Sequence, residues 1–168
     1  YGNPAVKTPC LDALAADGVC FDAAYANCPV CVPSRASMAI GDYGSRHGYW
    51  DNAYAYDGKV KSWGSRLTEQ GFSVTTIGKL HFKGDMPETG FPDQRIPLHI
   101  KDGIGDVYGE IRDRQITRPQ FCKALEEARA GESDYTRYDR EVARRAAEFL
   151  RTEGSVSQSP FALMAGFV

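Results

Sequence analysis

The sequence predicts an α/β fold, a mainly parallel sheet sandwiched by helices, and two observations carry this prediction. Amphipathic segments alternate along the chain with short runs of β-branched or apolar residues, which is the pattern of parallel strands joined by helical crossovers. The chain also has 168 residues, which suffices for one domain or most of one.

The first half of the chain opens with a helix. Thr8 and Pro9 are suited to a helix start and Gly18 to its end, because Thr caps well and Pro at the first position loses no hydrogen bond. Residues 19–25 predict a short strand. A short helix is then expected over 33–40, ended by Gly41.

The second half continues the alternation. A helix is expected over 62–70 and a β-branched strand over 72–77. Pro, Gly and Asp are scattered with little periodicity between 83 and 131, so this segment is predicted to be an irregular insertion. A helix with clear apolar spacing begins at Asp134, and 161–168 predicts a strand buried on both faces.

Composition excludes several classes of protein. Hydrophobic residues make up 42% and charged residues 25% of the chain, which is ordinary for a globular protein. Lys and Arg number 20 against 22 Asp and Glu, so no basic field favours a nucleic-acid partner. The longest apolar run is far shorter than the roughly 20 residues that a membrane span needs. We therefore expect no nucleic-acid partner and no membrane span.

The five cysteines are too few and odd in number for a disulfide scaffold. They are Cys10, Cys20, Cys28, Cys31 and Cys122. They fit a reducing compartment, which favours the cytoplasm slightly over a periplasmic or secreted location, or one cysteine with a chemical role. Cys28 and Cys31 could instead form a redox pair or half of a zinc site, although no second pair completes such a site.

Two polar clusters follow predicted strands. One runs from Cys31 to Arg35 and the other from Lys79 to His81. Ligands of open parallel sheets bind beyond the carboxyl ends of the strands, so we expect the clusters to meet across one crevice. A helix start and a guanidinium favour a tetrahedral anion, and a cation beside an imidazole suits cleavage of an anionic ester. The alternative is an inert cysteine, a core histidine and a surface lysine.

Four segments of the sequence resemble one family. Cys31-Val32-Pro33-Ser34-Arg35 resembles the C-x-P-S-R core of the type I, formylglycine-dependent sulfatases of the alkaline-phosphatase-like superfamily. The segments before it, 8–15 and 19–25, resemble the helix and strand that precede this core, and 78–82 resembles the GKxH element. The resemblance covers about the first half of the chain and points to bacterial choline-sulfatase-like and arylsulfatase-like members.

The resemblance implies a sulfuric ester hydrolase. In this family a formylglycine-generating enzyme oxidises the motif cysteine to an aldehyde. One hydroxyl of the aldehyde hydrate, held on a divalent cation (Ca²⁺ or Mg²⁺), attacks sulfur, and the second hydroxyl then allows sulfate to leave. Cys31 is accordingly the predicted formylglycine precursor, nucleophile and metal ligand. Arg35 would hold the diol, Lys79 would contact the sulfate, and His81 would bond the second hydroxyl.

A further pair, Asp51-Asn52, resembles a DN pair of the choline-sulfatase-like branch, whose Asn contacts sulfate. Asn52 and Lys79 are therefore the predicted substrate-binding residues, and a polar turn is an equal alternative for Asn52.

The resemblance also sets the expected organisation. Residues 1–168 are expected to be the N-terminal part of a single catalytic domain, because other metal ligands of the family lie outside this chain. The substrate is expected to be a small-molecule or sugar sulfate ester, and a homo-oligomer is left open. This chain alone is expected to bind calcium weakly and to be inactive. The alternatives are a phosphonate or phosphate monoester hydrolase of the same superfamily and a non-catalytic fragment.

Overall fold

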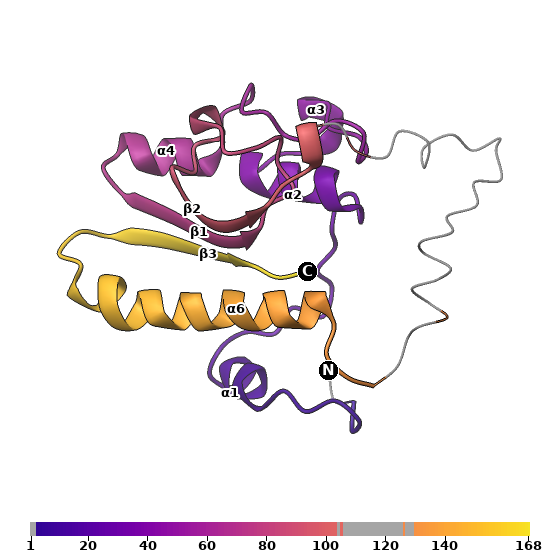
Figure 1. Ribbon diagram of the computed structural model, residues 1–168, viewed down its shortest axis with the longest axis vertical. Helices are drawn as coiled ribbons and strands as arrows, with labels where there is room; N and C mark the ends of the chain where they lie inside the picture. The colour runs from indigo at the N-terminus through magenta and orange to yellow at the C-terminus, as the bar shows by residue number, and fades with distance from the viewer. Residues whose placement is uncertain (1–2, 104, 106–125, 127–129) are drawn as a thin grey trace.

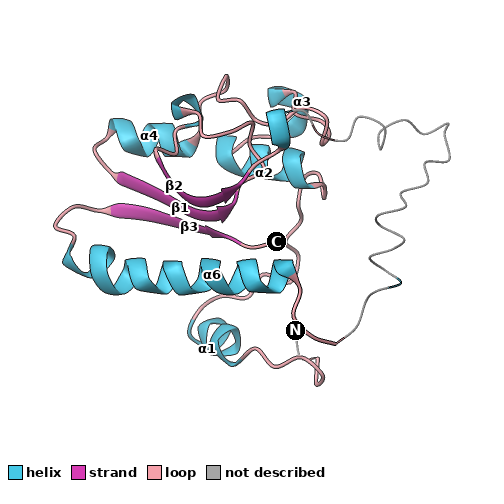
Figure 2. Cartoon of the chain, viewed as in Figure 1, coloured by secondary structure: helices cyan, strands magenta, loops and turns pink. Residues whose placement is uncertain are grey.

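Three parallel strands form one sheet with helices on both faces in the computed structural model, which describes residues 3–103, 105, 126 and 130–168. β1 (Ser73–Lys79) is central, between β2 (Asp93–Leu98) and β3 (Phe161–Gly166). α6 (Asp134–Phe149) covers one face, and α2 (Cys31–Ile40) and α4 (Trp63–Glu69) lie over the other (Figure 1; Figure 2). The predicted fold class is confirmed.

The helices that the sequence predicts for the second half begin at side-chain caps. Ser62 Oγ accepts the Ser65 N–H at 3.0 Å at the start of α4 and donates to the Thr89 carbonyl at 2.7 Å. Ser133 and Thr136 form a reciprocal capping box before α6, which satisfies N–H groups that lack helical partners. α6 continues into a π-helical turn, η4 (Leu150–Gly154). Local side-chain chemistry therefore sets where these helices begin.

The N-terminal segment differs from its prediction in one element. α1 (Pro9–Asp17) forms as expected, with no buried residue. The prediction of a strand over 19–25 is wrong, since this segment is irregular. Its large apolar side chains are exposed to solvent: the exposed fraction is 77% for Val19, 72% for Phe21 and 90% for Tyr25. A strand needs a neighbour for its N–H and C=O groups, and none of the described residues pairs with this one.

The segment 83–131 is not irregular throughout, in contrast to its prediction. It contains η1 (Pro87–Thr89), η2 (Lys101–Gly103) and the strand β2, which pairs with β1 from Thr75↔Asp93 to Lys79↔Leu98. Pro97 weakens the strand signal, yet Pro is tolerated on an edge strand because an outward-facing N–H needs no partner. Residues 104, 106–125 and 127–129 lie outside the described residues, and so does Cys122.

The core packs against both faces of β1. On the α2–α4 face, Tyr56 is fully buried and meets Tyr49 and Phe82 edge to face. On the α6 face, Ile77 packs with Val142 and Phe149. β3 forms within the predicted 161–168 but is half-buried rather than buried on both faces, because it is an edge strand of the described sheet.

Candidate functional site

Cys31 is the first residue of α2, so the helix begins at Cys31 rather than at Pro33 as predicted. No side chain of the helix caps it; instead Asn52 Oδ1 accepts the Val32 N–H at 2.9 Å. Ser34 lies inside the helix. The exposed Cys31 thiol therefore stands at a helix N-terminus, where backbone N–H groups and the helix dipole favour negative charge.

Arg35 braces α2 against two strand ends. Its Nη1 donates to the Lys79 carbonyl at 2.6 Å and its Nη2 to the Phe167 carbonyl at 3.1 Å. Burial lowers the pKa of the guanidinium, and the charge of Cys31 opposes that shift. A guanidinium has five N–H donors, so this brace leaves donors free for a ligand.

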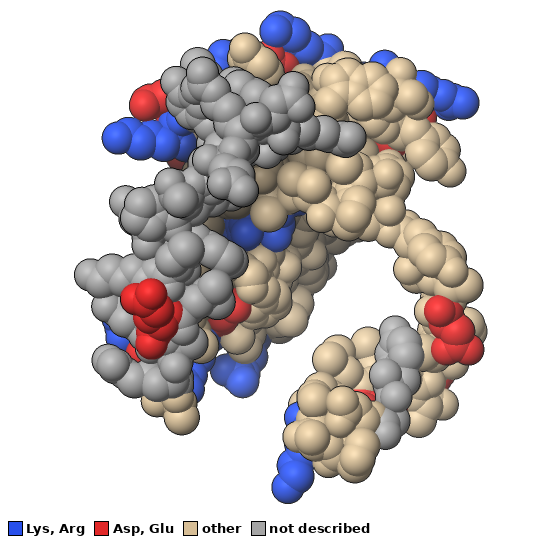
Figure 3. Space-filling view, turned by 90° about the vertical axis from the view of Figure 1, so that its right-hand side faces the viewer, with Lys and Arg blue, Asp and Glu red and all other residues tan. Residues whose placement is uncertain are grey.

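A pocket of about 470 Å³ lies where the helix and strands meet. Cys31 and Arg35 of α2, Lys79 of β1 and residues 164–167 at the end of β3 line it. Lys79 is only 9% exposed. Figure 3 views the side of the molecule toward which the strands run and shows Lys or Arg atoms in a hollow of this face. The structure thus brings together three of the four predicted catalytic side chains.

His81 follows Lys79 but is not among the residues that line this pocket. Its backbone has φ of +55°, a left-handed conformation that is strained for a residue with a Cβ, and its N–H donates to the Leu98 carbonyl at 2.8 Å. Burial, and then the charges of Lys79, Arg35 and His99, lower the pKa of His81 to about 4. Its imidazole is therefore neutral near pH 7, and its unprotonated ring nitrogen can accept a hydrogen bond.

Asn52 lies beside the start of α2 rather than in the pocket wall. Its Oδ1 is occupied by the Val32 N–H, and the preceding Asp51 accepts the Ala53 N–H at 2.8 Å. The predicted polar turn is present, and it also positions the start of α2. A contact of Asn52 with substrate stays a prediction.

Two histidines lie near these elements without having been predicted as site residues. His47, at the end of α3 (Gly44–His47), places Nε2 2.7 Å from Ser37 Oγ, and its Nδ1 accepts the Tyr49 N–H at 3.1 Å. The neutral ring therefore carries its proton on Nε2 and cannot take the proton of Ser37. This pair attaches α3 to α2 and is no Ser–His nucleophile.

The other such histidine is His99, which follows β2. Its side chain is 15% exposed, and its Nε2 lies 3.5 Å from Asp85 Oδ1. A histidine between two apolar residues, Leu98 and Ile100, was the available signal, since polar residues at strand ends are typical of ligand sites.

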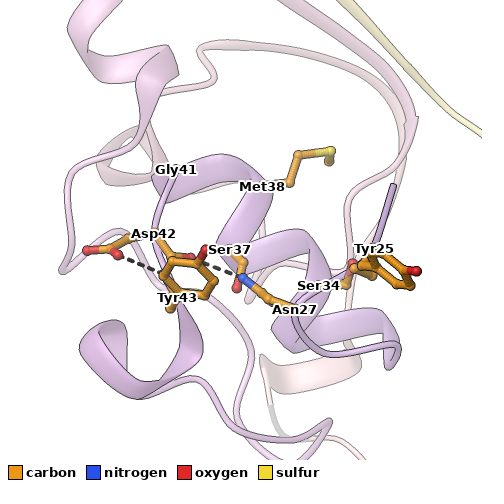
Figure 4. Close-up of a pocket in the computed structure, with 9 residues that line it drawn as sticks. Tyr25, Asn27, Ser34, Ser37, Met38, Gly41, Asp42 and Tyr43 are labelled. Atoms are coloured by element: carbon orange, nitrogen blue, oxygen red, sulfur yellow. Dashed lines mark hydrogen bonds between the residues drawn. The ribbon is translucent and has the colours of Figure 1, made fainter. Parts of the chain in front are cut away.

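A second hollow, of about 410 Å³, flanks α2 (Figure 4). Ser34 and Met38 line both this hollow and the pocket beside Cys31. Asn27 Nδ2 donates to the Asp42 carbonyl across it at 3.4 Å. Among the described residues that line it, Asp42 is the only charged one and none is a histidine, so the pocket with Arg35 and Lys79 suits an anion better.

Within the described ranges the structure contains neither a cluster of metal-binding side chains nor a disulfide. There, no three His, Cys, Asp or Glu side chains are grouped so that they could hold a metal ion. Cys10, Cys20, Cys28 and Cys31 are free thiols. The described helices include none that is both long and apolar enough to cross a membrane.

Comparisons with known proteins agree on one family. The family model described as Sulfatase matches residues 1–168. The chain is 28% identical to the "Uncharacterized sulfatase YidJ" of Escherichia coli (strain K12), over 99% of this chain and 34% of that protein. It is 28% identical to arylsulfatase K of Canis lupus familiaris over 98% of this chain and 29% of that protein. It is 34% identical to the choline-sulfatase of Rhizobium meliloti (strain 1021) over 53% of this chain and 17% of that protein.

The fold has a solved counterpart. The crystal structure of yidJ from Bacteroides fragilis superposes with a TM-score of 0.61 at 22% identity, covering 98% of this chain and 39% of that chain. The chain thus spans about a third of the length of the relatives that it matches along nearly all of its own length.

Proposed function

Because this chain belongs to the sulfatase family, we propose that it is the nucleophile-bearing part of a sulfuric ester hydrolase. The observation that carries the proposal is the brace made by Arg35, which ties the helix of Cys31 to the carboxyl ends of β1 and β3. This brace puts an exposed thiol at a helix N-terminus and a nearly buried ammonium into the wall of one pocket. A sulfate ester needs that combination of a nucleophile and fixed positive charge.

Cys31 is proposed to act after oxidation to formylglycine, whose hydrate supplies the attacking hydroxyl and a second hydroxyl for release of sulfate. Its exposure at the first helical position leaves the side chain open to solvent and substrate. The helix N-terminus stabilises negative charge that develops on the attacking oxygen.

Lys79 and Arg35 are proposed to bind the sulfate group. The backbone of Lys79 is held in β1 and the Arg35 guanidinium by its two carbonyl partners, so the guanidinium is fixed before substrate arrives. Preorganised charge stabilises the transition state without a reorganisation cost. His81, whose lowered pKa of about 4 keeps the ring neutral, is proposed to accept a hydrogen bond from the second hydroxyl, and Asn52 to position Cys31 and contact sulfate.

The described residues do not by themselves form a site for the predicted divalent cation. Of the family's ligands only Cys31 is predicted within this chain, and the described residues offer no group of three ligands. Ca²⁺ or Mg²⁺ therefore stays a prediction for the whole protein, in which Cys31 would be one of its ligands.

Mass spectrometry of the tryptic peptide that contains Cys31, from protein made in its natural host, tests the modification. Conversion to formylglycine lowers the peptide mass by about 18 Da, whereas a disulfide lowers it by only about 2 Da, and fragment ions assign that disulfide to Cys28 and Cys31 rather than to Cys10 or Cys20 of the same peptide. The disulfide mass would support the redox alternative and contradict the proposal.

Steady-state kinetics of the full-length protein test the reaction itself. We expect kcat/KM to be higher for 4-nitrophenyl sulfate than for a matched aryl phosphonate monoester. The reverse order would assign the site to phosphonate or phosphate ester hydrolysis, since tetrahedral phosphoryl and sulfuryl groups make similar demands on it.

A further inference from the structure

The segments that follow β1 and β2 run side by side beyond the sheet. The Leu98 carbonyl accepts both the Leu80 N–H at 3.2 Å and the His81 N–H at 2.8 Å, and the Ile100 N–H donates to the Phe82 carbonyl at 3.0 Å. These bonds hold the left-handed backbone of His81 in place. They also fix the residue between Leu98 and Ile100, which is His99, on the segment next to His81.

Three imidazole nitrogens in this place lack hydrogen bonds among the described residues. They are Nδ1 of His81 and both Nδ1 and Nε2 of His99, and all three are buried. Buried polar nitrogens are nearly always paired, so unpaired ones point to a missing water, ion or ligand. Asp85 Oδ1 lies 3.5 Å from His99 Nε2, which is too long for a hydrogen bond. His99 Nδ1 is left free for another partner.

The charges around these nitrogens favour an anion. Lys79 comes from β1 and Arg35 from α2, and the charges of both act on His81, as does that of His99. The acidic group that faces His99 is Asp85, which is 69% exposed and therefore well screened by solvent. Two cations and two imidazoles at the ends of neighbouring elements suit a tetrahedral oxyanion.

We propose that His99 is a substrate-binding residue, whose Nδ1 donates a hydrogen bond to a sulfate oxygen while Nε2 faces Asp85. This inference rests on the proposed function and extends the anion site from β1 to β2. A packing role alone would not need the ring nitrogens: the imidazole lies 6.5 Å from the Phe82 ring, centroid to centroid, and an apolar side chain of similar size would fill that space.

Three substitutions in the full-length protein separate these roles. His99→Asn keeps a donor near the position of Nδ1, His99→Gln keeps one near Nε2, and His99→Leu keeps neither. Binding of inorganic sulfate is measured by calorimetry, and kcat and KM are measured with 4-nitrophenyl sulfate. We expect His99→Leu and His99→Gln to weaken sulfate binding by about 10- to 100-fold, the range for a hydrogen bond to a charged group, and His99→Asn to stay within about threefold of wild type.

His47→Asn is the matched control, because His47 ends α3, contacts Ser37 of α2 and lies on neither of the segments that follow β1 and β2. It should leave sulfate binding unchanged. Equal sulfate affinity of wild type and His99→Leu would overturn the inference, and so would recovery by Gln instead of Asn, or a wild type that binds no sulfate. Sulfate binding that depends on His99 without turnover of any aryl sulfate would support this inference and contradict the hydrolase proposal.

Discussion

Replacement of Arg35 by Met removes the brace between α2 and the strand ends. The bond to the Lys79 carbonyl is short, at 2.6 Å, and partly buried, whereas the bond to the Phe167 carbonyl is longer, at 3.1 Å, and exposed. A hydrogen bond to a charged group contributes about 1.5–3 kcal/mol when sheltered and about 0.5–1 kcal/mol when exposed. We therefore expect the free energy of unfolding to fall by about 2–4 kcal/mol.

The assay is urea unfolding of the protein at pH 7.5, followed by circular dichroism. Arg35→Lys keeps the charge but reaches at most one of the two carbonyls, so about half of the loss should return. Arg46→Met is the control, because the Arg46 side chain is 72% exposed and, among the described residues, pairs only with Asp42 at 3.3 Å. Exposed pairs contribute about 0.2–1 kcal/mol.

Two outcomes would refute this reasoning. A loss for Arg35→Met within about 0.5 kcal/mol of that for Arg46→Met would show that the brace does not hold the site together. Full recovery of stability by Arg35→Lys would show that charge alone, rather than the forked geometry of the guanidinium, is what matters.

Three further predictions concern pH, packing and activity. Burial lowers the pKa of His47, so the stability that neutral His47 contributes is present above the unfolded-state pKa of about 6.5 and is lost as pH falls through the folded-state pKa. The free energy of unfolding should therefore fall less between pH 7.5 and pH 5 in His47→Gln than in wild type. An equal fall in the two proteins would count against this prediction. Gly78→Ala would place a Cβ 2.3 Å from the Gly166 carbonyl oxygen, on a backbone with φ of +101°, so the free energy of unfolding in urea should fall by about 2–3 kcal/mol. Gly41→Ala is the control: its Cβ would meet no atom within 4 Å, and the expected loss is about 1 kcal/mol. Equal losses in the two variants would contradict the close approach of Gly78 to Gly166. The 168-residue chain alone should not hydrolyse 4-nitrophenyl sulfate with or without added calcium, and turnover at the rate of the full-length protein would show that the prediction is wrong.

Local chemistry in the sequence was enough to predict most helices and the central strand. Ser62 and Ser133 mark helix starts through hydrogen bonds within three residues, and such bonds depend on nothing distant. The β-branched run before Gly78 likewise predicts β1. The motifs at Cys31 and Lys79 pointed to the family, and the match over the whole chain confirms that family.

Pairing and side-chain convergence depended on the tertiary structure. Residues 19–25 have the composition of a strand but no pairing partner among the described residues, whereas 93–98 contain Pro97 and still form β2 because β1 offers its edge. Strand formation is decided by the neighbour that completes the hydrogen bonds, so sequence alone cannot settle it.

For the candidate site too, the sequence determines some features and the tertiary structure determines others. The order of the residues is enough to show which chemical groups the chain carries: a thiol at a helix start, a guanidinium one helical turn on, and an ammonium and an imidazole after a strand. The folded chain adds that Arg35 uses two donors on strand carbonyls, that Asn52 caps α2, and that His99 lies beside His81. These contacts join residues far apart in the chain, and their geometry arises only when the sheet brings the strand ends together.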